Sequence, residues 1–233
     1  MSEKPLGGKS YGSIPHLPGS RLGPGDHRIS DGQARICTDR VRDRHDLVLV
    51  QEKLDGSNVG VALLNGVILP LTRAGYLATT SAFEQHHYFA HWACANEARF
   101  RAVLSEGERL CGEWLAQAHG TRYRLAHEPF VAFDLFRNNR RVVYRNFLEV
   151  AQSGEFVTPY TWHGPTSIEQ MLGRFDKEGS AHGAIDPVEG AVWRVERRGE
   201  VDFLAKYMRP EKIDGCYLPE RTGDEAVWNW KPG

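Results

Sequence analysis

Lys53-Leu54-Asp55-Gly56-Ser57-Asn58 is a polar segment between two apolar runs. The run before it, Asp46–Gln51, and the run after it, Val59–Leu64, have the length and composition of strands. Asn65-Gly66 then predicts a tight hairpin turn into a third strand, Val67–Leu71. Lys53 therefore stands where one strand ends and an antiparallel hairpin begins. At the edge of such a sheet we expect its amine to be partly desolvated, which lowers a lysine pKa and favours the neutral, nucleophilic form.

The segment combines groups that suit phosphate chemistry. Asp55 can hold the lysine or a metal ion, and Gly56 lets the backbone approach a phosphate because it has no Cβ. Taken alone, a Lys-x-Asp-Gly sequence also fits a turn with a surface lysine. Other segments of the chain are needed to distinguish a phosphate-binding site from such a turn.

The composition indicates one globular protein rather than a basic nucleic-acid binder. The chain has 233 residues, 41% of them hydrophobic and 25% charged, with a formal net charge of −1. A polyanion would therefore have to meet a local patch such as 40–44 or 137–141. Four cysteines without a Cys-x-x-Cys pair argue against a zinc knuckle or a disulfide framework. No signal-peptide or membrane-length apolar stretch appears, so we expect a cytoplasmic protein without a membrane partner.

The pattern of elements favours an α+β fold with antiparallel sheets, because strands and helices mix irregularly. Residues 1–35 are rich in Gly, Pro, Ser and His and predict an arm without regular structure. Residues 36–210 would form one domain and residues 211–233 a short tail. Further strands are expected at 109–115, 130–136, 142–144, 190–196 and 201–206.

Three capping boxes predict the helices. Ser81-x-x-Glu84 opens a helix that runs to about Leu104. Asn146-x-x-Glu149 and Thr166-x-x-Glu169 open two shorter helices, which Gly154 and Gly173 would end.

Five further segments place polar or aromatic side chains near strand ends. They are Leu71-Thr72-Arg73-Ala74-Gly75, Gly112-Glu113-Trp114, Val131-Ala132-Phe133-Asp134, Glu189-Gly190 and Leu204-Ala205-Lys206-Tyr207. Taken singly, each fits a surface charge, a strand cap or a core residue. Taken together and in this order, they look like one binding site.

In this order the six segments resemble the motifs of the covalent nucleotidyltransferases, the superfamily of ATP-dependent RNA and DNA ligases and mRNA capping enzymes. The resemblance extends from about Val50 to Arg209. The segment at Lys53 is similar to the nucleotidyl-lysine motif. Glu52 before the lysine and Asn58 at the end of the motif most resemble the RNA ligase branch of the bacteriophage nick-sealing type.

The resemblance implies a nucleotidyltransferase domain of antiparallel sheets flanked by helices, with ATP and Mg²⁺ or Mn²⁺ as cofactors. It implies catalytic roles for Lys53, Glu189 and Lys206, and metal binding by Glu113 and Glu189. The implied nucleotide-binding residues are Glu52, Lys53, Asn58, Arg73, Glu113, Phe133 and Lys206, with Phe133 stacking on the purine.

The implied activity is RNA ligation in three steps. Lys53 attacks the α-phosphate of ATP, the AMP moves to a 5′-phosphate end, and a 3′-hydroxyl then displaces the AMP. The implied partner is nucleic acid, namely RNA and in particular a nicked duplex. Phosphoryl transfer needs charge neutralisation and in-line placement, which Arg73 and Lys206 can provide.

The chain departs from the family pattern at its closing motif and after it. Family members usually carry a second lysine two residues after the first, where this chain has Met208. Because residues two apart share a face of a strand, we expect Lys206 to contact the phosphate alone. Family ligases also carry a C-terminal domain, for which 211–233 is too short. A protein partner that supplies its function is therefore one expectation, and the oligomeric state stays open.

Two other functions remain as alternatives. One is a nucleotidyltransferase that caps RNA or modifies another acceptor, which a preference for GTP would distinguish. The other is a non-catalytic nucleotide- or RNA-binding module, which would not need the nucleophile Lys53. Ser57 has no evident His/Asp order around it, so a hydrolase triad is not expected.

Overall fold

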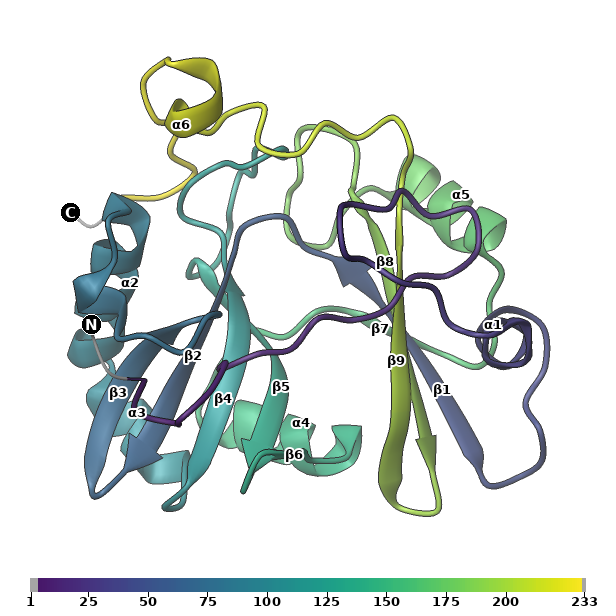
Figure 1. The fold of residues 1–233 in the computed structure, drawn as a ribbon, viewed down its shortest axis with the longest axis horizontal. Coiled ribbons are helices and arrows are strands. Elements are labelled where there is room, and N and C mark those ends of the chain that lie inside the picture. Colours follow the sequence, from purple (N-terminus) through teal and green to yellow (C-terminus); the bar gives the residue numbers. More distant parts are fainter. Residues whose placement is uncertain (1–3, 232–233) are drawn as a thin grey trace.

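The strands form two antiparallel sheets in the computed structural model, which describes residues 4–231 (Figure 1). The order in the first, sheet A, is β7-β1-β8-β9, and the order in the second, sheet B, is β3-β2-β4-β5-β6. The strands of sheet A are β1 (Asp46–Lys53), β7 (Thr161–His163), β8 (Gly190–Arg197) and β9 (Glu200–Met208). Those of sheet B are β2 (Ser57–Leu64), β3 (Val67–Thr72), β4 (Glu108–Trp114), β5 (Phe130–Arg137) and β6 (Arg140–Arg141). The predicted α+β fold with antiparallel sheets is confirmed.

Each sheet has its own hydrophobic core, formed with helices that cover one of its faces. The helices are α1 (Asp31–Thr38), the 3₁₀ turn η1 (Ala78–Thr80), α2 (Glu84–Ala95), α3 (Glu97–Val103), α4 (Tyr144–Ser153), α5 (Ile168–Glu178) and α6 (Pro219–Thr222). Helices α2, α3 and α4 pack against sheet B through Phe89, Phe100 and Phe147, which are fully buried. Helices α1 and α5 pack against sheet A through Ile36 and Phe175. The other faces of the two sheets are left to form a site between them.

The hairpin at Asn65-Gly66 is confirmed, because both residues have positive φ angles, 52° and 72°, as a two-residue turn requires. The strands around Lys53 nevertheless belong to different sheets. Strand β1 lies between β7 and β8 in sheet A, whereas the β2–β3 hairpin lies in sheet B. We expected Lys53 at the edge of a sheet, and this expectation is wrong. Lys53 lies at the point where the chain crosses from one sheet to the other.

Several helices begin or end at other residues than we predicted, because the burial of apolar side chains decides where each helix lies along the sequence. The predicted helix to Leu104 is interrupted at Asn96, and Phe83 rather than Ser81 precedes α2. Helix α5 is capped by the box Ser167/Gln170 instead of the neighbouring Thr166/Glu169, which buries Met171 and Phe175 on one face. Gly173 lies inside α5, whereas Gly154 ends α4 as predicted.

The predicted secondary structure is wrong for two segments. Residues 142–144 do not form a strand, because α4 begins at Tyr144 and buries Phe147 and Ala151 four residues apart. Helix α1 begins at Asp31, inside the arm that we expected to lack regular structure, with a capping box formed by Ser30 and Gln33.

The arm and the tail both pack on the sheets. The arm crosses from sheet B to sheet A (Figure 1): the amides of Ser10 and Tyr11 lie 3.1 and 3.3 Å from the carbonyl oxygen of Arg73, and Leu17 N–H donates to Lys206 at 2.8 Å. In the tail, Trp230 packs edge-on against Trp114 of β4 at 5.6 Å between ring centroids. Residues 1–3 of the predicted arm and 232–233 of the predicted tail lie outside the described residues, and the division of the chain at 36 and 210 stays a prediction.

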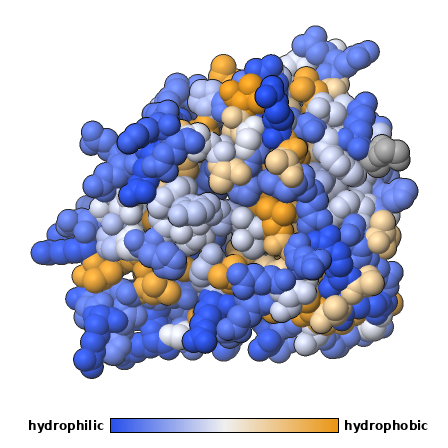
Figure 2. Space-filling model, turned by 180° about the vertical axis from the view of Figure 1, so that it is seen from behind, coloured by the Kyte–Doolittle hydropathy of each residue, from blue (hydrophilic) through white to orange (hydrophobic). Residues whose placement is uncertain are grey.

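The surface seen from behind is mostly hydrophilic, with its apolar residues in small separate groups (Figure 2). Among residues 4–231, no helix is both long and apolar enough to cross a membrane.

A buried ion-pair network joins the two sheets. Arg194 of β8 donates to Asp134 of β5 at 3.0 Å, and the two residues are only 3% and 1% exposed. Asp134 also accepts hydrogen bonds from Arg141 at 2.5 Å and from Tyr11 at 3.1 Å. Arg194 in turn donates to Glu196 at 2.6 Å. Every charge in this network has a partner, which a buried charge requires.

Removing one member of this network should therefore be costly. We expect Asp134→Ala to lower the free energy of unfolding by about 3–5 kcal/mol, because two arginines lose their buried counter-charge. Urea unfolding measures the change. The control is Arg145→Ala, which breaks an exposed pair with Glu149 and should cost less than about 1 kcal/mol. Equal losses in the two variants would contradict a structural role for the network.

Candidate active site

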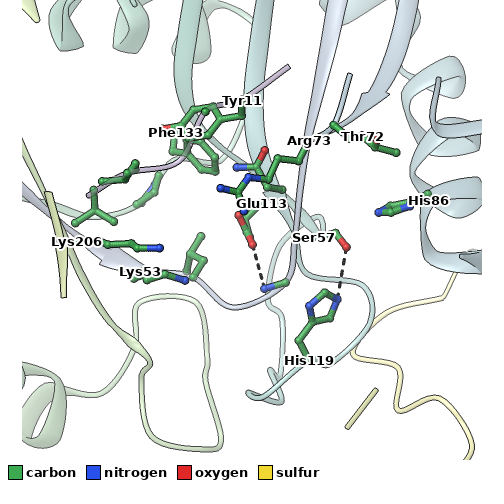
Figure 3. A pocket seen from close by; sticks show the side chains of 18 of the residues that line it. Tyr11, Lys53, Ser57, Thr72, Arg73, His86, Glu113, His119, Phe133 and Lys206 are labelled. Atoms are coloured by element: carbon green, nitrogen blue, oxygen red, sulfur yellow. Dashed lines mark hydrogen bonds between the residues drawn. The ribbon is translucent and has the colours of Figure 1, made fainter. Parts of the chain in front are cut away.

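A cavity of about 650 Å³ opens between the two sheets. All of the residues that we expected to bind the nucleotide line it, namely Glu52, Lys53, Asn58, Arg73, Glu113, Phe133 and Lys206. Figure 3 labels five of them, Lys53, Arg73, Glu113, Phe133 and Lys206. Glu189 does not line the cavity but lies buried behind Lys53, with 3% of its surface exposed. The structure thus brings the predicted site residues together, while their roles stay predictions.

The pairing of β1 with β8 places Lys53 beside Glu189. Lys53 is opposite Gly190 in this register, and its Nζ lies 2.5 Å from Glu189 Oε2. Gly190 cannot carry a side chain, because a Cβ there would lie 1.9 Å from the carbonyl oxygen of Tyr207. A glycine after Glu189 therefore allows β8 to pack closely on β9 next to Lys53.

The surroundings of Lys53 favour its charged form. Burial alone lowers its pKa, but the carboxylates of Glu189, Glu113 and Asp55 outweigh burial and raise the pKa above the usual lysine range. Our expectation of a lowered pKa is therefore wrong. Lys53 is an ammonium ion at neutral pH, and it must lose a proton before it can act as a nucleophile.

Asp55 and Gly56 have structural contacts in addition to the roles that we expected, which stay predictions. Asp55 Oδ2 accepts hydrogen bonds from Gly120 N–H and Thr121 Oγ1, both at 3.0 Å, and so holds a loop of the protein. A Cβ on Gly56 would lie 2.5 Å from the carbonyl oxygen of Trp114. The glycine therefore allows close contact with the neighbouring strand β4.

Glu113 and Glu189 form a donor set that fits a hard divalent cation. Burial raises the pKa of Glu113 to about 8, and repulsion from Glu189 adds to the effect. Burial also raises the pKa of Glu189. Residues 4–231 contain no cluster of three or more His, Cys, Asp or Glu arranged for a metal. A cation here would therefore take its remaining ligands from water and phosphate oxygens, as Mg²⁺ commonly does.

Phe133 reaches the cavity through a β-bulge. The pairing of β4 with β5 shifts between Cys111 and Gly112, so that Phe133 has no partner in the ladder. As a result Phe133 and its neighbour Asp134 both contact Tyr11, the first through its ring at 5.3 Å and the second through a hydrogen bond. Bulges commonly redirect a side chain next to a functional site.

The closing segment of β9 presents Lys206 to the cavity. Burial and repulsion from Lys53 lower the pKa of Lys206. Met208 does not line the cavity, and its N–H donates to Ser20 of the arm at 3.0 Å. Arg209 turns away to Val188 and Asp176. Lys206 is thus the cation that this strand presents to the cavity.

Sequence reasoning missed the cavity residues that no motif marks. Tyr11 comes from the arm, and its hydroxyl and ring are both buried against β5. His119 lies 3.5 Å from Ser57 Oγ, and no spacing in the sequence pairs these two residues. Ser57 donates its proton to Gln85 at 2.7 Å.

Comparisons with known proteins identify the fold and the family. The sequence model of the RNA ligase family matches residues 46–208. No curated protein matches the chain. Among solved structures, an archaeal ATP-dependent RNA ligase is 20% identical with a TM-score of 0.48, over 70% of this chain and 42% of its own. A Naegleria gruberi RNA ligase variant with ATP and Mn is 15% identical with a TM-score of 0.53, over 86% of this chain and 60% of its own.

The likeness to the Naegleria structure confirms the predicted type of fold. This chain spans less than two thirds of either solved ligase. The bacteriophage nick-sealing branch that we named is not distinguished by the family match and stays a prediction.

Glu52 should make stability depend on pH. Burial raises its pKa from 4.5 to about 7, so the folded state binds this proton more tightly than the unfolded chain. Below pH 4.5 the Glu52 carboxyl is protonated in both states and does not lower the free energy of unfolding. The free energy of unfolding falls as the pH rises from 4.5 to 7. Glu52→Gln should therefore raise the free energy of unfolding by up to about 3 kcal/mol at pH 8 and leave it unchanged at pH 4. Urea unfolding at both pH values, with the exposed Glu149→Gln as control, tests this; an equal effect at both would refute it.

Lys206 and Met208 should differ sharply in a labelling assay with ATP. Losing a charged hydrogen bond to phosphate costs roughly 1.5–3 kcal/mol, or about ten- to a hundredfold in rate. We expect Lys206→Ala to slow labelling at least about tenfold, and Met208→Ala and Arg209→Ala to change it little. A large loss in Met208→Ala with none in Lys206→Ala would show that the closing motif is aligned wrongly.

Proposed function

Because this chain belongs to the RNA ligase family, we propose that it is an ATP-dependent RNA ligase that joins 5′-phosphate and 3′-hydroxyl ends through a lysyl-AMP intermediate. The observation that carries the proposal is the contact between Lys53 and Glu189 at the wall of a cavity that also presents Arg73 and Lys206. One amine, one adjacent carboxylate and two further cations are the groups that nucleotidyl transfer to a lysine requires.

Glu189 holds the proton on Lys53, because its Oε2 lies 2.5 Å from the ammonium nitrogen. A divalent cation on the buried carboxylates would offset their charge and favour loss of this proton to solvent. The neutral amine then forms a bond to the α-phosphorus of ATP while the bond to pyrophosphate breaks. The electron pair leaves with pyrophosphate, and the nitrogen loses its second proton to solvent.

The remaining residues hold the nucleotide. Phe133 provides an aromatic face for adenine at the end of the cavity next to Tyr11. Arg73 and Lys206 neutralise phosphate oxygens. The amide oxygen of Asn58 is buried, has no hydrogen-bond partner within residues 4–231, and accepts a hydrogen bond from the ligand. Mg²⁺ or Mn²⁺ on Glu113 and Glu189 would neutralise the carboxylates that keep Lys53 charged and would bind phosphate oxygens.

In the second and third steps, AMP passes from Lys53 to the 5′-phosphate of one RNA strand, and the 3′-hydroxyl of the other attacks that phosphorus. The new P–O bond forms as AMP leaves with its electron pair, and the 3′-hydroxyl loses its proton to solvent. RNA is thus the proposed partner, and a nicked duplex the proposed form. A cytoplasmic location and a partner protein in place of a C-terminal domain stay predictions.

The deciding experiment is covalent labelling with α-labelled ATP and Mg²⁺. We expect one acid-labile, base-stable phosphoramidate on Lys53. Lys53→Ala should abolish it without unfolding the protein, and Lys53→Arg should do the same because a guanidinium stays protonated. The exposed Lys231→Ala is the control. Full labelling of either Lys53 variant would overturn the assignment, and labelling by GTP in preference to ATP would favour a capping-type enzyme.

A further inference from the structure

The cavity has two chemically different ends (Figure 3). Lys53 and Lys206 lie with Phe133 at one end, and Arg73 and Glu113 lie between the ends. The other end is formed by the start of β2, by α2 with the turn before it, and by the loop after β4. The side chains that this second end presents to the cavity are Ser57, Thr80, Ser81, Phe83, His86 and His119. Not one of these six carries a carboxylate, an ammonium or a guanidinium.

The hydrogen bonds at this end decide which imidazole nitrogen is left for a ligand. Gln85 Oε1 can only accept, and His119 Nε2 lies 3.0 Å from it. His119 Nε2 therefore donates, and its Nδ1 keeps a lone pair. Ser81 Oγ accepts from Phe83 N–H at 3.1 Å and lies 2.6 Å from His86 Nδ1. Because a hydroxyl can both donate and accept, the contact with Ser81 occupies His86 Nδ1 in either tautomer and leaves Nε2 for a ligand.

The two imidazoles thus each offer one ring nitrogen to a ligand, and that of His119 is an acceptor. Neither His86 Nε2 nor His119 Nδ1 has a protein partner within residues 4–231, and both rings line the cavity. Gln85, which orients His119, is only 4% exposed, so the orientation of His119 is held from inside the protein. Sugar hydroxyls both donate and accept, so they can bond to either ring nitrogen.

Electrostatics argue against a phosphate group at this end. Burial lowers the pKa of His86 to about 4. Burial also lowers the pKa of His119. Both rings are therefore neutral at pH 7 and cannot offset the charge of a triphosphate. A neutral ligand part with hydroxyl groups fits better, and Phe83, which is 46% exposed, adds an apolar surface for a base.

We propose that this end of the cavity binds the terminal ribonucleoside of the RNA strand that supplies the 3′-hydroxyl, with His86 and His119 at its ribose hydroxyls. The inference rests on the proposed function, because ligation brings a second nucleoside next to the adenylylated end. The adenosine of ATP is assigned to the other end, where Phe133 and the two lysines lie. The 2′-hydroxyl then distinguishes an RNA end from a DNA end.

The test is single-turnover sealing of a pre-adenylylated 5′ strand to a 3′ strand that ends in ribose or in 2′-deoxyribose. The protein as it stands should seal the ribose end about tenfold faster, the ratio that one lost hydrogen bond produces. His86→Leu should lose that preference by slowing the ribose end alone. His86→Gln, which keeps a hydrogen-bonding group at this place, should restore much of it. The control is His91→Leu, an exposed histidine of the same helix outside the cavity.

Labelling of Lys53 by ATP, measured on the same variants, separates the outcomes. Labelling within about twofold of normal, together with a lost ribose preference, supports the inference. An unchanged preference in both His86→Leu and His119→Leu overturns it, and so does an equal slowing of labelling, which would assign this end to ATP. If the unaltered protein does not label at all, the proposed function fails instead. Circular dichroism confirms that each variant is folded.

Discussion

The ion pair between Arg194 and Asp134 is the contact on which the site depends, because it is the buried charged link between two sheets that otherwise have separate cores. Each sheet packs its helices on one face and turns the other face toward the cavity. Asp134 also holds Tyr11 of the arm, and Tyr11 packs against Phe133. The separation of the sheets, the course of the arm and the position of the aromatic ring are therefore set by one network.

Lys53 shows how strand register and electrostatics act together. The register of β1 on β8 places its ammonium against Glu189, and the buried carboxylates then hold the proton on the lysine. Under the proposed function, nucleophilic attack by Lys53 therefore depends on a bound cation that offsets the charge of these carboxylates. Coulomb attraction at this distance in a buried site is strong enough to decide the protonation state.

The sequence predicted those features that local spacing determines. The strands around Lys53, the Asn65-Gly66 turn and the set of residues that converge on the cavity could all be predicted, because each motif except that of Phe133 lies near the end of one strand. The division of the strands between two sheets could not, since it depends on long-range pairing. The bulge at Phe133 could not be predicted either, because it arises from the pairing of two strands that are distant in the sequence. Tyr11 and His119 were not predicted, because tertiary packing rather than their spacing in the sequence brings them to the site.

The distribution of charge along the cavity limits which ligand groups each end can hold. Lys53, Arg73 and Lys206 can offset the charge of phosphate groups, whereas the side chains at the end with His86 and His119 are neutral and attract no phosphate. A second polyphosphate or a second ATP would therefore bind poorly at the end with His86 and His119. Under the proposed function, the neutral imidazoles held by Gln85 and Ser81 bind hydroxyl groups instead. Charge then selects what binds beside Lys53, and hydrogen bonding selects what binds at the opposite end of the cavity.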